Sequence, residues 1–457
     1  MDTVRIRKLA SEETLFRLTV LIMLIMPVSE ILTGIVSHFS KLIVPSFFQP
    51  VILGIYGAAG TLFALFYKSV ELTEQTAVKR FYAADVFYLI LIFFMIVSAV
   101  FSTNPGVYSD GIVLICENPL HFLAYYFLFF SGSRIRSDGY RRKLVIAFLG
   151  IAAVQGIIAF FQTFNIEIAY CLLLRHDRAA YGLTQNSNFY GGLSVFLLAC
   201  CSGAYLFCES FTVNKAVRCI LPALSGLVFY TMMGSRARLA WLGFFVMSAF
   251  YLVSGLIMLK GNIEKGALKR YFIRFAVLCA VFMVVFAITH AATNFVTEEV
   301  QRTQMEIDGK LNNGLGSDRL VNWKFGIESI PRHWLTGIGL DNYRQVFFEN
   351  PKYIQGTYFQ DKAHNEYIHV IATQGVFAFA AYLTLLVRTI AVAVKSIFKG
   401  ESETEQALTW IFLGMFVTYA AQATANTSVI NVAMYFWIVL GLLNNSDRPI
   451  SLFNKKI

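Results

Sequence analysis

The sequence predicts an all-α polytopic membrane protein that has about twelve transmembrane helices and one large helical loop outside the cytoplasm. Hydrophobic residues make up 57% of the chain and charged residues only 14%, and the mean hydropathy is +0.60, which is far from a soluble domain. The apolar residues come in long runs, and one long polar interval lies between the runs that end near Ala292 and begin near Asn365. A single large loop of this kind is where we expect the chemistry.

Twelve apolar runs are expected to cross the membrane, because a helix needs about 20 mostly apolar residues to span the hydrocarbon core. They cover residues 15–37, 46–67, 83–101, 111–130, 144–163, 188–208, 218–233, 239–259, 272–291, 365–387, 407–425 and 429–443. The chain then divides into the first nine spans (1–292), the extracytoplasmic loop (293–364), and the last three spans with a cytoplasmic tail (365–457).

The basic residues predict the orientation. Most of the 38 Lys and Arg fall in segments on the same side as the N-terminus, and positive charge accumulates in short cytoplasmic loops. Both termini are therefore expected in the cytoplasm and the long loop outside, and the net charge of +10 needs no nucleic acid to explain it. The first apolar run is long and lacks a small-residue cleavage site, so we expect a retained span. Six of the seven cysteines lie in predicted spans, so no disulfide framework or zinc site is expected.

Two of the acidic residues in the early spans, Glu30 and Glu117, are considered for a functional role. Glu30 is near a span end, where a functional role and an interfacial role fit equally well. Glu117, Asn118 and Pro119 fall inside the fourth predicted span. Proline removes a backbone donor and bends a helix, so this span is expected to be kinked, either as a plain structural feature or as the wall of a polar cavity.

Arginines occur at two turns on the predicted outer side. Arg178 precedes a Gly, Gln, Asn and Ser segment that leads to Asn188 at the start of the sixth span. That segment fits a helix cap or, with Arg178, the lining of a polar pocket. Arg236 and Arg238 lie at a tight turn between two spans, where positive charge is disfavoured. We expect Arg236 to bind an anion, whereas Arg238 fits a ligand role and contact with lipid headgroups equally well.

The polar interval is expected to fold into helices and turns, with hydroxyl or carboxylate side chains at the helix starts. The expected elements are an amphipathic helix over 297–308, a helix capped by Ser317 or Asp318 that runs to about Ser329, a turn at Gly337–Gly339, and a helix over Asp341–Phe348.

Arg319 lies in the first turn of the second of these helices. A positive charge there opposes the helix dipole, so helix stability does not account for it. An anionic ligand and a salt bridge to Glu299 or Glu306 are both consistent with this position.

His364 lies at the membrane edge beside Asn365 and Glu366. A neutral imidazole there could accept a proton from a hydroxyl, and a structural histidine is the alternative. The chain has no DxD clamp, GxSxG elbow or HExxH site. We therefore expect a transfer reaction that needs neither a metal nor a cofactor, in which guanidinium groups hold any diphosphate.

At these residues the chain resembles the O-antigen ligase and O-antigen polymerase family of bacterial integral-membrane glycosyltransferases, over roughly Arg178 to Gly375. Ser187 departs from the proline often found at its position, which affects that turn alone. The elements that carry the resemblance are Gly182–Asn188 with Gly191, Ser235–Ala237, Arg319 with Trp323, Gly337 with Gly339, and His364–Asn365 with Gln374–Gly375.

The resemblance implies a fold like the C-type glycosyltransferases and a place in the bacterial inner membrane. It implies a polyprenyl-diphosphate-linked oligosaccharide as donor, and a glycan, glycolipid or glycoprotein hydroxyl as acceptor at the outer leaflet, in an inverting, metal-independent transfer. Polymerase and ligase both fit, with a slight preference for polymerase. The residues implied are Arg236 and Arg319 on the diphosphate with Arg178 as a weaker candidate, His364 on the acceptor hydroxyl or the diphosphate, and Asn188, Arg238, Asn365 and Glu366 in support.

Two other classes of protein are kept as alternatives. A secondary transporter of an organic anion or glycolipid would suit twelve spans, but transporters commonly have two similar halves, and the large loop has no counterpart in the first half of this chain. A receptor or assembly scaffold would leave the arginine turn unexplained.

Overall fold

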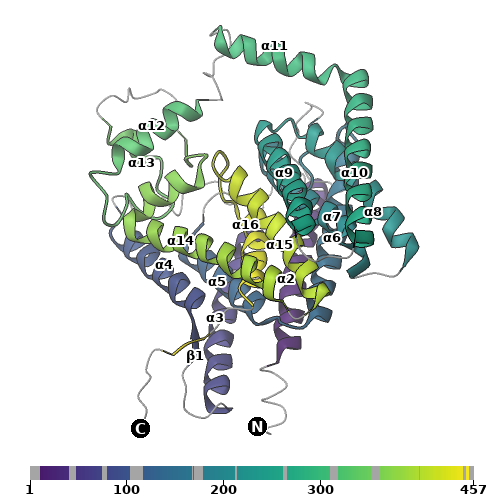
Figure 1. Cartoon of the computed structure of the whole chain (residues 1–457). Helices are drawn as coiled ribbons and strands as arrows, with labels where there is room; N and C mark the ends of the chain where they lie inside the picture. Colours follow the sequence, from purple (N-terminus) through teal and green to yellow (C-terminus); the bar gives the residue numbers. More distant parts are fainter. Residues whose placement is uncertain are drawn as a thin grey trace.

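The computed structural model is a bundle of long helices with a folded loop at one end (Figure 1). It describes residues 11–40, 48–74, 80–102, 117–166, 168, 179–210, 214–260, 265–308, 318–350, 360–400, 402–445 and 449–451. The helices of the bundle are α2 (Glu12–Ser40), α3 (Phe48–Glu74), α4 (Ala83–Val100), α5 (Pro119–Arg134), α6 (Asp138–Gln162), α7 (Ser187–Leu206), α8 (Lys215–Gly234), α9 (Arg238–Lys260), α10 (Lys265–Thr293), α14 (Glu366–Lys399), α15 (Glu403–Gln422) and α16 (Ile430–Leu443).

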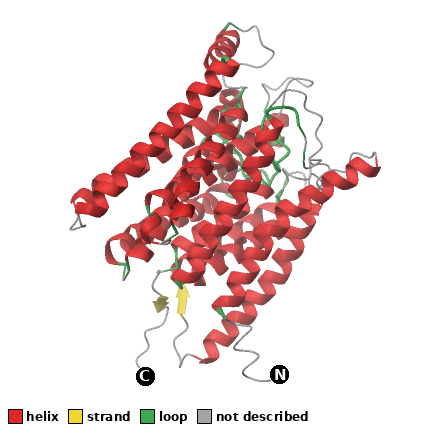
Figure 2. Cartoon of the chain, turned by 90° about the vertical axis from the view of Figure 1, so that its right-hand side faces the viewer, coloured by secondary structure: helices red, strands yellow, loops and turns green. Residues whose placement is uncertain are grey.

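The remaining elements are short. The loop between α10 and α14 holds α11 (Phe295–Ile307), α12 (Arg319–Ser329) and α13 (Gln345–Phe348), and the turn η2 (Cys208–Ser210) follows α7. The sequence did not predict the strands β1 (Arg80–Tyr82) and β2 (Pro449–Ser451), which pair antiparallel with Arg80 opposite Ser451. We call the end that carries α11, α12 and α13 the loop end, and the end that carries the strands the far end (Figures 1 and 2).

Each predicted span overlaps one of the bundle helices, so the polytopic all-α class is confirmed. Within the described residues, nine helices are long and apolar enough to cross a membrane. Helices α5 and α16 are short, at 16 and 14 residues. The count of twelve spans and the sidedness of the loop stay predictions.

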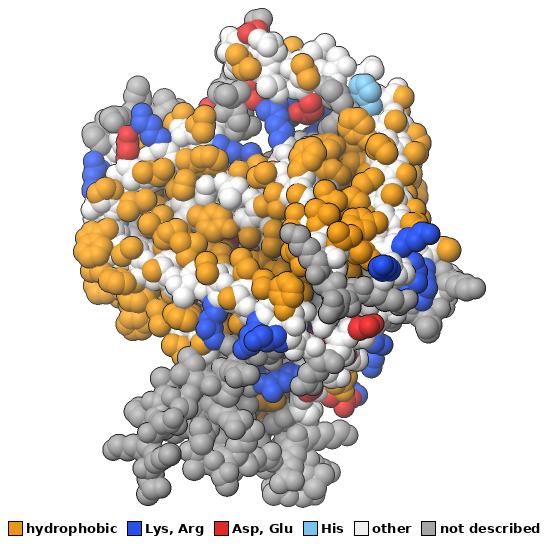
Figure 3. Space-filling model, viewed as in Figure 1, with side chains coloured by type: hydrophobic (Ala, Val, Ile, Leu, Met, Phe, Trp, Pro, Cys, Tyr) orange, Lys and Arg blue, Asp and Glu red, His pale blue; other side chains and the backbone are white. Residues whose placement is uncertain are grey.

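The helices of the bundle differ in how deeply they are buried. Helix α7 is apolar on all sides, and 94% of its apolar window is buried, in contact with α6, α8, α9 and α15. A helix of this kind belongs in a core. Helix α10 is as apolar but only 17% buried. Figure 3 shows hydrophobic side chains covering the middle of the molecule and charged ones gathered above and below, as expected of a surface that faces lipid.

One buried ion pair joins α4 to α5. Arg134 donates to both carboxylate oxygens of Asp85, at 3.0 and 2.6 Å, and its guanidinium lies 3.8 Å from the Phe130 ring centroid. The two charged side chains are only 4% and 1% exposed. Each charge therefore depends on the other, because an isolated charge in this position would be costly.

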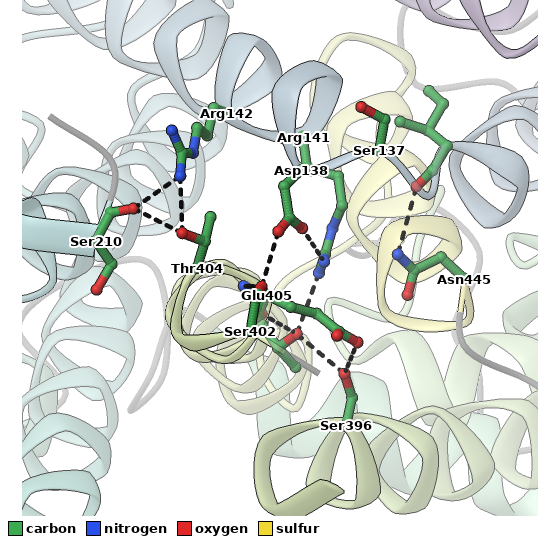
Figure 4. A network of polar contacts seen from close by, with 12 residues as sticks. Ser137, Asp138, Arg141, Arg142, Ser210, Ser396, Ser402, Thr404, Glu405 and Asn445 are labelled. Carbon is green, nitrogen blue, oxygen red and sulfur yellow. Dashed lines mark hydrogen bonds and ion pairs between the residues drawn. The ribbon is translucent and has the colours of Figure 1, made fainter. Parts of the chain in front are cut away.

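A polar network closes the far end of the bundle (Figure 4). Ser402 donates to Asp138 at 2.9 Å, and the buried Arg141 lies 3.5 Å from the same carboxylate. Arg142 donates to the Thr404 hydroxyl at 2.7 Å. These contacts fix the start of α6 against the start of α15.

The fourth span differs from the prediction. Pro119 was expected to kink a helix over 111–130, but it occupies the first turn of α5, where its missing N–H has no intrahelical acceptor to lose. Asn118 caps the helix by accepting from the backbone of Leu120 and His121, and His121 Nδ1 accepts from the Asn118 N–H at 3.1 Å. Residues 103–116 lie outside the described part. The polar Glu117 is therefore placed at the end of a helix rather than within one.

Candidate active site

Helix α14 is broken near its start, and the loop packs into the break. Gly375 has φ 82° and ψ 177°, which interrupts the helix. The backbone of Val376 donates to Trp334 at 2.8 Å, and the backbone N–H groups of Ile338 and Gly339 donate to Ala372 and Thr373 at 2.9 and 3.1 Å. The loop is thus bonded to α14 on both sides of the break.

Glycines make this close approach possible. A Cβ on Gly375 would lie 2.3 Å from the carbonyl oxygen of Leu335, and one on Gly337 would lie 2.1 Å from the carbonyl carbon of Thr373. Both glycines, and Gly339, have positive φ values that L side chains rarely adopt. The predicted turn at Gly337–Gly339 is confirmed, and its function is to dock on α14.

The predicted helix over Asp341–Phe348 is shorter in the structure. Asp341 has φ 57° and lies in a turn, and only Gln345–Phe348 is helical, as α13. The buried Tyr343 of this turn donates its hydroxyl to the carbonyl of Asn322 in α12 at 2.7 Å. Asp341 is therefore directed toward the membrane helices instead of starting a helix.

A cluster of buried charges lies under this turn. Lys362 Nζ is 2.5 Å from Asp341 Oδ1 and 3.3 Å from Glu117 Oε2, and all three side chains are 3 to 4% exposed. The Glu117 backbone N–H donates to Asp341 Oδ2 at 2.7 Å, and His369 Nε2 lies 3.5 Å from Asp341 Oδ1. Burial raises the pKa of Asp341, but Lys362 and His369 lower it by more, so this carboxylate stays ionised.

The same cluster lines a small cavity. The cavity measures about 20 Å³ and is bounded by Glu117, Asp341, Lys362 and His369 together with Glu366 and apolar side chains of α4, α5 and α16. This volume holds about one water molecule. Glu366 accepts hydroxyl bonds from Tyr382 at 2.8 Å and Tyr419 at 3.3 Å, so the supporting residue predicted beside His364 is turned into the bundle.

His364 lies at the edge of the cluster, between the loop and α14. Its backbone is left-handed, with φ 50°, and its Nε2 is 3.1 Å from Gln360 Oε1. An amide oxygen only accepts, so Nε2 carries the proton and Nδ1 is left as the acceptor. Burial lowers the pKa of His364 to about 4, and the positive charges of Arg319 and Lys362 and the nearby His369 contribute. The ring is therefore neutral near pH 7 and able to take up a proton.

Arg319 begins α12, as predicted. Asp318 occupies the N-cap position with φ 60°, but its side chain makes no capping bond, so the expected cap is wrong for this residue, and Ser317 lies outside the described residues. Arg319 is near enough to His364 to lower the pKa of that histidine. Asn365, the other supporting residue, caps α14 by accepting from the backbone of Ile368 at 3.0 Å.

Arg236 and Arg238 form a second group, under α11. Arg238 donates to Glu299 at 3.1 Å and to Glu306 at 2.8 Å, the two glutamates considered as partners of Arg319. Arg236 has φ 55° and lies 3.6 Å from Glu298, and both of these side chains are about half exposed.

A pocket of about 500 Å³ opens between these arginines and α11, and Figure 3 shows the corresponding hollow near the top of the molecule. Below Arg236 and Arg238 its wall is aromatic, formed by Trp241, Phe245 and Phe286. It thus combines a cationic rim with an apolar wall. The face of α11 that covers it consists of Glu299, Val300, Thr303, Gln304 and Ile307.

The remaining predicted residues have varied outcomes. Arg178 lies outside the described residues. Asn188 is exposed at the start of α7, where the side chain of Asn186 accepts from its backbone N–H at 2.8 Å, so the expected cap is confirmed. Glu30 accepts from Gln185 in the turn before α7, which favours the structural interpretation of this acid.

The structure thus places Arg319 near enough to His364 for its charge to lower the pKa of the imidazole, and it places Arg236 with Arg238 under α11; α11 and α12 both lie at the loop end (Figure 1). Sequence reasoning missed Lys362, Asp341 and His369, and considered Glu117 only as a possible cavity wall. The available signal was the position of Glu117 inside a predicted span, since a buried acid requires a partner. Within the described ranges no three His, Cys, Asp or Glu side chains gather as a metal site requires, and metal independence stays a prediction.

The fold and these two groups define a multi-pass membrane protein with two charged groups of side chains at the loop end of its helix bundle. Residues 223–383 match the family model described as O-antigen ligase, and Arg236, Arg319 and His364 all lie inside the match. This match, over 161 of the 457 residues, supports the resemblance of the chain to the O-antigen ligase and O-antigen polymerase family. The family indicates a glycosyltransferase-type enzyme of the bacterial inner membrane that acts with lipid-linked oligosaccharide and acceptor glycan. A search of curated proteins finds no match to the chain.

Proposed function

We propose that this protein transfers an oligosaccharide from a polyprenyl-diphosphate carrier to a hydroxyl of an acceptor glycan at the outer leaflet. The observation that carries the proposal is a neutral His364 at the junction of loop and bundle, near enough to Arg319 for that charge to lower the pKa of the imidazole, with both residues inside the segment that matches the family. The orientation with both termini in the cytoplasm, predicted from the basic residues, would present this site to the outer leaflet.

The arginines act on the leaving group. As the bond between the sugar C1 and the diphosphate oxygen breaks, negative charge grows on the diphosphate. Fixed guanidinium groups stabilise that charge more than they stabilise the bound donor, which lowers the barrier. Arg319 supplies such a charge beside His364. Arg236 supplies one above an aromatic wall suited to the first units of a prenyl chain.

His364 acts on the acceptor. Its Nδ1 takes the proton of the attacking hydroxyl while that oxygen forms the new bond to C1, and the polyprenyl diphosphate departs with the electrons of the broken bond. Attack from the face opposite the diphosphate inverts the anomeric centre. The buried cluster under His364 has no space for a sugar, which leaves the open side of the ring for the acceptor.

Reconstituted transfer tests the proposal. Purified protein in detergent or vesicles is given a synthetic polyprenyl-diphosphate oligosaccharide and acceptor glycans in the presence of EDTA, and products are separated on a gel. We expect transfer without added metal. A ladder of repeats would identify a polymerase, our preferred form, and a single shifted band a ligase. Failure with several donors and acceptors, combined with uptake of an anion or glycolipid into vesicles, would instead support the transporter class.

A further inference from the structure

We propose that Lys362 is a positioning residue for this reaction, whose buried ammonium group holds His364 and Arg319 together and keeps positive charge beside the imidazole. The inference rests on the proposed function for its chemistry. Lys362 belongs to none of the motifs that carry the family resemblance.

The side chain of Lys362 joins the loop to the membrane helices. Its carboxylate partners come from two distant places in the chain: Asp341 from the turn before α13, and Glu117 from the start of α5. Glu117 is itself fixed, because it accepts from the Tyr125 hydroxyl at 2.8 Å and from Ser428 at 2.8 Å. Lys362, which lies two residues before His364, is therefore bonded to a carboxylate that is itself held in place.

The backbone of Lys362 makes the second connection. Its carbonyl accepts from the side chain of Asn322 at 2.9 Å, and Asn322 lies in α12 one turn after Arg319. Lys362 is thus bonded through its side chain to the bundle and through its backbone to the helix that begins with Arg319. A shift of this residue would move both groups of the site.

A purely structural role does not account for a charged group here. Apolar side chains of similar volume can replace buried ion pairs with little or no loss of stability, and the surroundings of this cluster include Leu91, Met95 and Phe122. A lysine that is 4% exposed is expected where its charge or its geometry serves another group. The group within reach is His364.

Charged or titratable groups act on His364 from each element around it. The positive ones are Arg319, from α12, and Lys362, from the segment that carries His364 itself, and the titratable His369 lies in α14. The negative charges of Asp341 and Glu117 are bonded to the ammonium group of Lys362. A positive charge near an imidazole disfavours the imidazolium, so Lys362 helps to keep His364 in the form that accepts a proton.

The test compares Lys362→Met, which keeps the length of the side chain and removes the charge, with Lys362→Arg, which keeps the charge. Transfer gives kcat, KM and their pH dependence. The reaction of His364 with diethyl pyrocarbonate, followed by mass spectrometry of its peptide across the pH range, gives its titration without requiring transfer. Gel filtration and thermal unfolding establish that each variant is folded.

For Lys362→Met we expect kcat to fall by about tenfold to a hundredfold with a smaller change in KM. The titration of His364 and the acid limb of kcat should both move upward by about one pH unit. Lys362→Arg should keep the titration of His364 near that of the wild type. An unchanged titration in a folded Lys362→Met protein would mean that Lys362 is only structural, and would overturn the proposal.

Asp341→Asn is the control for general loosening of the loop, and it also replaces Lys362→Met if that variant does not fold. This change removes a negative charge from the cluster, so the titration of His364 should stay in place or move downward, while general loosening of the loop would move it upward. An upward shift would therefore contradict the proposal. Because the modification of His364 needs no substrate, absence of transfer by the wild type would count against the proposed function and leave this test standing.

Discussion

Replacing Gly375 by alanine tests the junction between the loop and the membrane helices. The new Cβ would lie 2.3 Å from the carbonyl oxygen of Leu335 and 2.9 Å from the Gly337 nitrogen, and both are backbone atoms that no side-chain rotation can move. The backbone of Gly375, at φ 82° and ψ 177°, is itself strained for any L residue. Such a conformation costs about 1–3 kcal/mol, and the clash adds to it, so we expect a loss of folding free energy on the order of 3 kcal/mol.

The assay is equilibrium unfolding of the purified protein in mixed micelles, with transfer measured on the same samples. Gly150→Ala is the matched control, because Gly150 is inside α6 and a Cβ there meets nothing within 4 Å. Alanine is the better helix former, so the control should be neutral or stabilised by up to about 1 kcal/mol. If both variants unfold at the same denaturant concentration, α14 is continuous through Gly375 and the docking of the loop is wrong.

Three further predictions concern charges. Arg236→Ala, Arg319→Ala and His364→Ala should each abolish transfer and leave a folded, inserted protein; near-normal activity in all three would refute the proposed roles. His364, whose pKa is lowered from 6.5 to about 4, should support transfer from neutral pH downward until the pH falls through about 4. The unfolded chain binds this proton at higher pH than the folded chain does. The free energy of unfolding should therefore decline as the pH falls from 6.5 to about 4, which a lower unfolding temperature would show. Asp85→Ala should cost about 3–5 kcal/mol by leaving Arg134 buried and unpaired, whereas Asp85→Leu with Arg134→Met should cost far less in the same unfolding assay.

Sequence reasoning predicted the elements well where local pattern decides them. The twelve apolar runs correspond to helices, the amphipathic helix over 297–308 is α11, and the helix to Ser329 ends where expected. Glycine and histidine motifs also marked the right places. Gly337 and Gly339 dock on α14, and His364 lies at the junction of loop and bundle.

The rest depends on contacts between distant parts of the chain. Thr373, Gln374 and Gly375 interrupt the apolar run, but a single glycine in a helical pattern does not by itself predict a break; the loop backbone that packs against Gly375 comes from residues about 40 positions earlier in the chain. Lys362 and Glu117 are separated by 245 residues, and no periodicity connects them. The position of Pro119 was also ambiguous, because a proline can either kink a helix or begin one. In the structure Asn118 caps α5, and Pro119 begins the helix.

The carboxylates of α11 give the two arginines beneath it different properties. Arg238 is bonded to Glu299 and to the buried Glu306 and ties α11 to the bundle, whereas Arg236 meets Glu298 in a pair that is half exposed on both sides and worth about 0–1 kcal/mol. Glu298 thus acts as an exchangeable counter-ion of Arg236. An anion that replaces Glu298 leaves the number of charge pairs unchanged. Added salt weakens both the Arg236–Glu298 pair that is lost and the pair between Arg236 and the anion that is gained. Binding at Arg236 is therefore expected to depend on ionic strength less than binding to an uncompensated arginine.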